Sequence, residues 1–495
     1  MTVVMALDQG TSSSRAMIFD DRGRVLGSGQ EPFDQIFPRD GWVEQDPDVL
    51  WQTSLRAGRT ALQAAGLSAR ELAAIGITNQ RETTLAWDAD SGAVLYNAIG
   101  WQDRRTADQA ARIKADGMAT TIQARTGLVA DPYFSSTKMA WLLSQVPAVR
   151  EAAERGTLRF GTVDCYLIWR LTGGQRHVTD ATNASRTQLF RLAEQSWDPE
   201  LLDYFGIPAS SLPEVLDSAA NFGTSEARWF GAGVPILGVA GDQHAALIGQ
   251  ACFEPGMTKS TYGTGCFLMS NTGQDILRSE HGLLSTMAYR IDGRPTYALE
   301  GSIFNAGVAV KWLRDKLGLI ATARASEDCA ERVGGDAGGV FVVPGFTGLG
   351  APHWRPDARG LVCGLTLDTG ADHVVTAVLQ SVAFQTQDLL AALKADGGQV
   401  SGLRIDGGMV ENNWLCQFLA DVAEVPVERP LVTETTVLGA ALLALLGTGA
   451  FSSLDDSTRL WQLQRRFEPV MPDQRRAALL DGWNQAVARA CLNTG

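Results

Sequence analysis

Residues 3–19 read VVMALDQGTSSSRAMIF and carry the clearest structural signal in the chain. The short apolar runs Val3–Leu7 and Arg15–Phe19 flank a turn rich in Gly, Ser and Thr, which predicts the two strands of a hairpin. Such a turn lets backbone N–H groups approach a phosphate closely, and its hydroxyls add donors. An ordinary hairpin has the same pattern, so this turn alone leaves both interpretations open.

The second half of the chain repeats this arrangement. An extended Thr258–Ser260 and the apolar run Cys266–Met269 flank another turn of small residues, Thr261–Gly265. In each half a later apolar strand ends in an acidic glycine turn: Val234–Val239 before Gly241-Asp242-Gln243, and Leu403–Ile405 before Asp406-Gly407-Gly408. Strands that alternate with amphipathic segments in this way predict an α/β fold.

Length and composition fit a large globular protein. The chain has 495 residues, of which 45% are hydrophobic and 20% charged, enough for two or three domains. We expect a boundary near Ala251–Gly256, between an N-terminal domain of residues 1–250 and a C-terminal domain of residues 251–495. The net charge of −13 argues against holding nucleic acid or anionic membranes by bulk charge.

Targeting and membrane signals are not evident in the sequence. The N-terminus has no basic segment and reaches Asp8 early, unlike a secretory signal. The longest apolar stretch, Val437–Ala450, contains glycines and is shorter than the roughly 20 residues of a membrane helix. Seven cysteines without a Cys-x-x-Cys pair argue against a disulfide framework or a zinc site. We therefore expect a cytoplasmic protein.

Asp242 is the candidate general base. It follows an apolar strand, where side chains of α/β sheets commonly meet ligands. A carboxylate near an alcohol accepts the hydroxyl proton as phosphoryl transfer proceeds. Asp8 stands at a similar strand end beside the first turn, where it could hold Mg²⁺. Either carboxylate could instead cap a helix or turn. The sequence lacks the P-loop, the dinucleotide-binding glycine motif and the protein-kinase motifs.

A small polyol could be held by Arg81 and Glu82, with the arginine donating to one hydroxyl and the glutamate accepting from its neighbour. An exposed hairpin ion pair is the alternative. Trp101 and Phe267 could cover a carbon skeleton, and Tyr133 could present its hydroxyl. Core packing is the alternative for all three aromatic residues, because the chain has 13 Trp and 18 Phe.

At this point the motifs match a known family. The chain closely resembles the FGGY carbohydrate kinases, which have the actin-like ATPase (ribonuclease H-like) fold of two domains with the active site in the cleft between them. The match covers nearly the whole length. It includes Thr179-Asp-Ala-Thr-Asn-Ala-Ser-Arg186. The combination that is specific for the branch that phosphorylates glycerol is Asn79-Gln-Arg-Glu-Thr83, Asp131-Pro-Tyr-Phe-Ser135 and Gly263-Thr-Gly-Cys-Phe267.

The resemblance implies transfer of a phosphoryl group from Mg-ATP to glycerol, giving sn-glycerol 3-phosphate, with Asp242 as the base. It implies that Asp8 and Asp242 hold Mg²⁺. Glycerol would be bound by Arg81, Glu82, Trp101, Tyr133, Asp242, Gln243 and Phe267. ATP would be bound by Thr11, Ser12, Ser13, Arg15, Thr264, Gly307, Lys311, Gly408 and Asn412. Relatives form homodimers and homotetramers, and either state is expected here.

Four departures from the family pattern are visible. Position 311 is Lys where the family often has Gln, and Asn305 stands where an apolar residue is common. Residues 227–234 (ARWFGAGV) lack the Gly-Gly-Thr-Arg type of loop that bacterial relatives inhibited by fructose 1,6-bisphosphate carry. Residues 221–226 (NFGTSE) lack the His through which some Gram-positive relatives are activated by phosphorylation. We predict neither control.

Two other functions are compatible with the motifs. Another FGGY kinase could act on a pentulose or a similar sugar, but relatives with larger substrates do not keep Arg81 and Glu82 together with Trp101 and Phe267. A non-catalytic, actin-like nucleotide-binding module is the second alternative. Retention of Asp8, Thr11, Asp242 and Thr264 argues against it.

Overall fold

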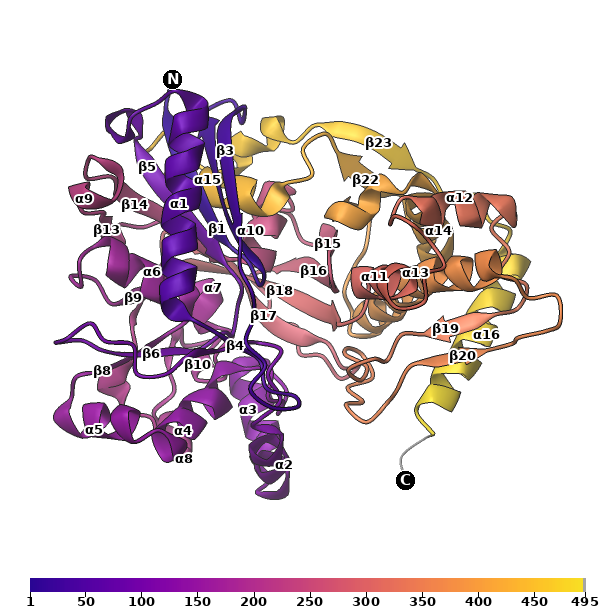
Figure 1. Cartoon of the computed structure of the whole chain (residues 1–495), viewed down its shortest axis with the longest axis horizontal. Coiled ribbons are helices and arrows are strands. Elements are labelled where there is room, and N and C mark those ends of the chain that lie inside the picture. Colours follow the sequence, from indigo (N-terminus) through magenta and orange to yellow (C-terminus); the bar gives the residue numbers. More distant parts are fainter. Residues whose placement is uncertain (493–495) are drawn as a thin grey trace.

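The computed structural model describes residues 1–492, and it is built around two β-sheets: the first lies in the left part of Figure 1, and the second extends from the middle of the view to the upper right. The first sheet has six strands in the order β13 (Gly223–Thr224), β14 (Pro235–Gly241), β5 (Ala74–Asn79), β1 (Val3–Gln9), β2 (Ser13–Asp20) and β3 (Val25–Pro32). The second has seven, in the order β17 (Leu284–Ile291), β18 (Arg294–Ile303), β16 (Cys266–Gly273), β15 (Thr258–Tyr262), β21 (Leu403–Asp406), β22 (Val427–Pro430) and β23 (Leu463–Phe467).

Helices cover both sheets, so the predicted α/β class is confirmed. In chain order they are α1 (Pro47–Ala65), α2 (Ala107–Ala115), α3 (Met118–Thr126), α4 (Ser135–Gln145), α5 (Pro147–Arg155), α6 (Val163–Leu171), α7 (Ala181–Ala184), α8 (Pro199–Phe205), α9 (Ala227–Phe230), α10 (Asp242–Gly249), α11 (Gly307–Asp315), α12 (Ala325–Arg332), α13 (Ala371–Ala395), α14 (Asn413–Ala423), α15 (Thr435–Gly447) and α16 (Asp473–Ala490).

Short strand pairs complete the structure. They are β4 (Glu44–Gln45) with β7 (Ala98–Ile99), β6 (Leu85–Asp88) with β8 (Leu158–Gly161), β9 (Val178–Asp180) with β12 (Glu214–Leu216), β10 (Phe190–Arg191) with β11 (Ser196–Trp197), and β19 (Phe341–Val343) with β20 (Leu361–Cys363). No helix within residues 1–492 combines the length and the apolarity needed to cross a bilayer.

The first sheet is buried on both faces, and strand β1 shows how the sequence achieves this. Because successive side chains of a strand point to opposite faces, Met5 and Leu7 pack in the hydrophobic cluster that contains α1 and α6. Val4 and Ala6 pack in the cluster that contains α15. The unbroken apolar run from Val3 to Leu7 in β1 therefore fits a central strand that helices cover on both sides.

Helix α15 joins the two halves of the chain. It lies late in the sequence yet packs against the strands β1, β5 and β14 of the first sheet and against α10 (Figure 1). Its apolar run was too short for a membrane helix, and the structure buries it within the protein instead. The boundary expected at residues 250 and 251 stays a prediction, because this helix crosses from the second half to the first.

Helix α10 begins earlier than the apolar pattern suggests. The sequence predicts a helix from Ala245, whereas the structure starts it at Asp242, with Gly241 as the N-cap residue. Asp242 therefore occupies the first helical position, where a carboxylate is favoured by the partial positive charge of the helix N-terminus. The hypothesis that Asp242 is itself the N-cap is wrong.

Candidate active site

The carboxyl ends of three neighbouring strands bring the predicted acidic residues together. Strand β1 is parallel to β5, with Gln9 beside Asn79, and β14 is parallel to β5, with Gly241 also beside Asn79. The three strands therefore end at one edge of the sheet. Asp8 lies at the end of β1, Arg81 and Glu82 follow β5, and Asp242 follows β14.

A cavity of about 370 Å³ opens at this edge. Of the residues predicted to bind a polyol, it is lined by all seven: Arg81, Glu82, Trp101, Tyr133, Asp242, Gln243 and Phe267. Of those predicted to bind ATP, it is lined by Thr11, Ser12, Thr264 and Lys311. Strands of both sheets thus contribute to one cavity, and polar groups for a polyol lie beside both glycine-containing turns.

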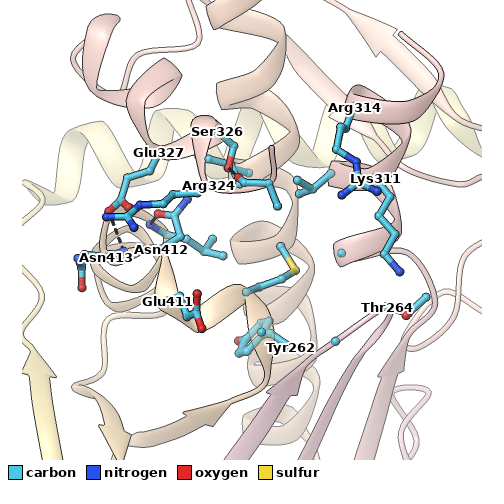
Figure 2. A pocket seen from close by; sticks show the side chains of 18 residues that line it. Tyr262, Thr264, Lys311, Arg314, Arg324, Ser326, Glu327, Glu411, Asn412 and Asn413 are labelled. Carbon is cyan, nitrogen blue, oxygen red and sulfur yellow. Dashed lines mark hydrogen bonds between the residues drawn. The ribbon is translucent and has the colours of Figure 1, made fainter. Parts of the chain in front are cut away.

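A larger cavity of about 570 Å³ lies within the second half of the chain (Figure 2). Of the predicted ATP-binding residues, its lining includes Thr264, Gly307, Lys311, Gly408 and Asn412. The two cavities share Gly263, Thr264 and Lys311. In Figure 2 the side chain of Lys311 extends from α11 toward Thr264. A ligand with a large head and a chain of phosphates can therefore pass from the larger cavity to the smaller one.

Arg81 and Glu82 are buried, with 3% and 1% of their surface exposed, so the exposed hairpin ion pair is wrong. Arg81 lies closer to the carboxylates of Asp242 and Glu300 than to that of Glu82, its neighbour in the sequence. Its Nε lies 3.1 Å from Asp242 Oδ1, and both terminal nitrogens donate to Glu300 of β18. The distance from Arg81 Nε to Glu82 Oε1 is 4.0 Å. Glu82 is instead held by Arg186, whose Nε donates to Oε1 over 2.5 Å.

The environment of Asp242 suits a base. Burial raises the pKa of the carboxyl, while Arg81, Lys259 and the N–H of Gln243 oppose this shift. That N–H donates to Asp242 Oδ1 over 2.7 Å. Lys259 of β15 is buried and donates to Gln243 Oε1 over 2.6 Å. A carboxylate that is raised in pKa but still flanked by two cations can both stay ionised and accept a proton.

The surroundings of Asp8 disfavour the ionised form of its carboxyl group. Burial and the nearby Asp242 raise the pKa of Asp8 to about 7, although Arg15 lowers it. The guanidinium of Arg15 pairs with Glu434 and donates to Gln30, and the amide of Gln30 donates to Ser13. Ser13 and Arg15 therefore lie outside the lining of both cavities in this conformation.

The aromatic residues form one side of the smaller cavity. Trp101 meets Tyr133 and Phe267 edge to face, with ring centroids 5.7 and 6.0 Å apart. Its indole N–H donates to Thr11 Oγ1 over 3.0 Å, which ties the apolar wall to the first turn. The hypothesis that these residues only pack in the core is wrong for all three, because each lines the cavity.

The second glycine turn is closed tightly on α11. The N–H of Gly307 donates to the carbonyl of Gly263 over 3.0 Å, and those of Ala306 and Val308 donate to that of Thr264. A Cβ at position 307 would lie 2.4 Å from the same Gly263 carbonyl, so only glycine permits this approach.

The first turn of α14 closes the larger cavity at its far end. Asn412 caps the helix by accepting from the N–H of Leu415, and its Nδ2 is buried without a partner among the described residues. Glu327 of α12 accepts from the N–H groups of Asn413 and Trp414 (Figure 2). Sequence reasoning missed Glu327 as well as two basic residues of the same cavity, Arg314 and Arg324.

Three charged residues around the smaller cavity were also missed as functional candidates: Lys259, Glu300 and Lys138. Glu300 and Lys259 stand inside strands, where a charged residue between apolar or small neighbours is a signal of a buried ion pair. Lys138 is buried on α4, and its ammonium donates to the carbonyls of Tyr133 and Glu82 over 2.7 and 3.3 Å. Burial lowers the pKa of Lys138 to about 7.

The unusual Asn305 is buried and lines neither cavity. Its Nδ2 lies 3.5 Å from both Thr347 Oγ1 and the carbonyl of Gly348. Residues 227–234, where the fructose 1,6-bisphosphate loop is absent, form α9 and a left-handed Gly231. Trp229 of this segment packs edge to face on Trp51 of α1, with centroids 4.9 Å apart.

Comparisons with known proteins agree with this arrangement. The FGGY family of carbohydrate kinases matches with its N-terminal domain over residues 3–249 and with its C-terminal domain over residues 258–448. Glycerol kinase 1 of Pseudomonas aeruginosa is 58% identical over 98% of both chains. The glycerol kinase of Rhodospirillum centenum is 56% identical over 98% of this chain and 97% of its own.

The solved structures add a match in three dimensions. The crystal structure of Plasmodium falciparum glycerol kinase with ADP has a TM-score of 0.90 at 36% identity, and the match covers 99% of this chain and 98% of the other. Together, the strand-end carboxylates, the two joined cavities and these matches identify the chain as a member of the FGGY family of carbohydrate kinases.

Proposed function

We propose that this protein transfers the γ-phosphoryl group of ATP to glycerol, giving sn-glycerol 3-phosphate, in the cytoplasm. The observation that carries this proposal is the smaller cavity, where Asp242 lies between polyol-binding groups and two turns built for phosphate. The relatives that are 58% and 56% identical over nearly the whole chain are named glycerol kinases, which supports glycerol rather than a sugar as the acceptor.

Five of the proposed glycerol-binding residues divide the work of recognition. Arg81 donates to hydroxyl oxygens, and the carboxylates of Glu82 and Asp242 accept from hydroxyl protons. The rings of Trp101 and Phe267 cover the carbon chain. The cavity of about 370 Å³ is the proposed place of both the acceptor and the γ-phosphate. Asp242 then accepts the proton of the attacking hydroxyl as the oxygen–phosphorus bond forms.

The larger cavity is our proposed site for the adenosine of ATP. The phosphates would leave it past Gly263, Thr264 and Lys311, the residues that both cavities share. Backbone N–H groups and hydroxyls of Thr11 and Ser12 would meet them from the other side, joined by Ser13 and Arg15 once the ion pair with Glu434 opens. We assign the acceptor to the domain of residues 1–250 and the nucleotide base to that of residues 251–495.

The residues present fit a magnesium ion. Asp8 and Asp242 offer hard carboxylate oxygens. Burial and, after it, repulsion from Asp242 raise the pKa of Asp8, and a divalent cation would relieve that repulsion. Within residues 1–492 no group of three or more metal-binding side chains forms a complete site. That agrees with Mg²⁺, which is usually held by one or two carboxylates together with substrate phosphates. The ion would neutralise charge on the transferring phosphoryl group.

The release of ADP from Mg-ATP tests this proposal. The assay compares glycerol, dihydroxyacetone, xylulose, ribulose and gluconate with a blank that contains no acceptor. We expect turnover with glycerol to exceed that with every sugar, and the blank to be low. Turnover that is highest with a sugar would overturn the assignment of glycerol, and no turnover with any acceptor would favour a nucleotide-binding module.

A further inference from the structure

Four buried side chains of alternating charge form a closed ring behind the smaller cavity. Glu300 accepts from Arg81 and, over 3.0 Å, from Arg186 Nη2. Arg186 donates to Glu82 over 2.5 Å, and Glu82 lies 4.0 Å from Arg81. None of the four exposes more than 3% of its surface. The ring thus contains two cations and two anions.

Only one side of this ring faces the cavity. Arg81 and Glu82 line it, whereas Arg186 and Glu300 do not. Arg186 follows helix α7, and Glu300 belongs to strand β18 of the second sheet. Arg186 and Glu300 therefore come from separate parts of the chain. Each holds a residue to which we assign binding of the acceptor.

The backbone at Glu82 is also fixed, which leaves its side chain as the adjustable part. Glu82 has a left-handed φ of 61°, a conformation that costs a residue with a side chain about 1 kcal/mol or more. Its carbonyl accepts from Thr84, Ser135 and Lys138 over 3.0, 3.1 and 3.3 Å. With the backbone anchored in this way, Arg186 determines where the carboxylate points.

We propose that Arg186 and Glu300 are positioning residues for the acceptor: Arg186 holds Glu82 as an oriented, ionised hydrogen-bond acceptor, and Glu300 holds Arg81 as an oriented donor. Neighbouring hydroxyls of the acceptor then meet one fixed acceptor and one fixed donor. This inference rests on the proposed function, because it concerns how that same site selects a vicinal diol.

The electrostatics of Glu82 agree with this role. Burial raises the pKa of Glu82, and Arg186 and then Arg81 oppose that shift, whereas Glu300 adds to it. Other titratable groups around the ring are Lys138, whose ammonium contacts the Glu82 carbonyl, the buried hydroxyl of Tyr133, and the buried His244, which interacts with Arg81, Glu300 and Arg186. Removal of the Arg186 charge would therefore raise the pKa of Glu82 and favour its protonated form.

Three variants test the proposal in the full-length protein: Arg186→Met, Arg186→Lys and Glu300→Gln. The double variant Arg186→Met with Glu300→Gln removes one charge of each sign, so it keeps the buried charge balanced if a single variant folds poorly. Arg290→Met is the matched control, because Arg290 forms a largely buried ion pair with Asp217 outside both cavities. Each variant is measured for KM with glycerol, KM with ATP, the pH profile of kcat/KM for glycerol, and melting temperature.

For Arg186→Met and Glu300→Gln we expect KM for glycerol to rise at least about tenfold, the usual effect of losing a hydrogen bond to a charged group, with KM for ATP changed less than about threefold. The acidic limb of the pH profile should move to higher pH in Arg186→Met, and Arg186→Lys should restore part of that shift. Arg290→Met should lower only the melting temperature.

A folded variant with an unchanged KM for glycerol and an unchanged pH profile would overturn the inference. The inference would also be overturned if KM for ATP rose as much as KM for glycerol, because the ring would then be a general stabilising element. Absence of glycerol turnover in the unmodified protein would instead refute the proposed function, so the two failures are distinguishable.

Discussion

Lys311 lies where the two cavities meet, and its ammonium extends toward the turn at Thr264 (Figure 2). Many members of the family have a neutral Gln at this position, so the lysine adds a positive charge close to the proposed path of the phosphates. The side chain is exposed, so water and dissolved salt partly screen its charge. We therefore expect the charge to strengthen nucleotide binding moderately.

The variant Lys311→Gln should raise KM for ATP by about three- to tenfold with little change in KM for glycerol. It should also weaken the dependence of KM for ATP on salt, because one charge is lost. Steady-state kinetics at two ionic strengths measure both effects. Lys316→Gln is the control, since Lys316 lies at the end of the same helix outside both cavities. An equal effect of the two variants would contradict the assignment.

Asp8 gives a prediction about pH. Its pKa in the folded, metal-free protein is about 7, against about 4 in an unfolded chain. Between these values the folded state binds more protons than the unfolded state, so Asp8 makes the protein less stable as the pH rises from about 4 to 7. Asp8→Asn should therefore raise the melting temperature at pH 8, leave it nearly unchanged at pH 4, and abolish turnover.

Thermal melts without magnesium measure this effect. Asp90→Asn is the control, because Asp90 is exposed and remote from both cavities. A variant Asp8→Asn that melts no higher than the unmodified protein at pH 8 would show that the carboxylate carries no electrostatic strain.

Among individual residues, the sequence predicted those that line the smaller cavity better than those that hold the lining residues in place. Arg81, Glu82 and Asp242 stand at strand ends within recognisable motifs, so their position could be predicted. For Glu300 and Lys259 the sequence could signal burial of a charge but not its partner, because neighbours far away in the sequence decide which charges meet. Pairing of Arg81 with Glu300, 219 residues apart, is a property of the tertiary fold alone.

At the scale of secondary structure, the sequence predicted the strands well because their apolar runs are short and bounded by turns. Strands β1, β2, β15 and β21 contain all the residues expected for them, and β14 contains all of the expected Val234–Val239 except Val234. The packing of α15 on the first sheet was not predictable, since the sequence of an apolar helix does not indicate which sheet the helix covers. The early start of α10 was also missed, because its first turn is polar.

The contact between α10 and α15 depends on two glycines. A Cβ at Gly439 would lie 1.8 Å from the Ala245 carbonyl, and one at Gly249 would lie 1.9 Å from that of Thr435. The two helices therefore touch backbone to backbone, and α10 carries Asp242 at its first position. Close packing here fixes the height of Asp242 above the sheet.

We expect Gly439→Ala to destabilise the protein by at least about 2 kcal/mol, because the helices must move apart, and to lower kcat as Asp242 shifts. Thermal or urea unfolding and steady-state kinetics measure these effects. Gly370→Ala is the control, since a Cβ there would meet nothing closer than 3.8 Å and φ is −103°. Equal stability of the two variants would contradict the role assigned to this helix contact.

At the scale of the whole molecule, the two sheets contribute complementary parts of one site. The first supplies the strand-end carboxylates, and the second supplies the turn at Gly263–Gly265 together with Glu300 and Lys259. Phosphoryl transfer needs alignment and charge neutralisation more than covalent chemistry, and a site shared between two units provides alignment only when both are in place. The expected homodimer or homotetramer stays a prediction, which light scattering on the purified protein would test.

Substitution of Asp242 by Asn tests most directly whether this carboxylate is the base at the junction of the two cavities. The variant is compared with the unmodified protein for turnover of Mg-ATP with glycerol and for affinity for ADP without magnesium. We expect turnover to fall at least about a thousandfold, as the loss of a general base implies, while ADP affinity stays within about threefold. Turnover within tenfold of the unmodified protein would refute the role of Asp242 and with it the proposed mechanism.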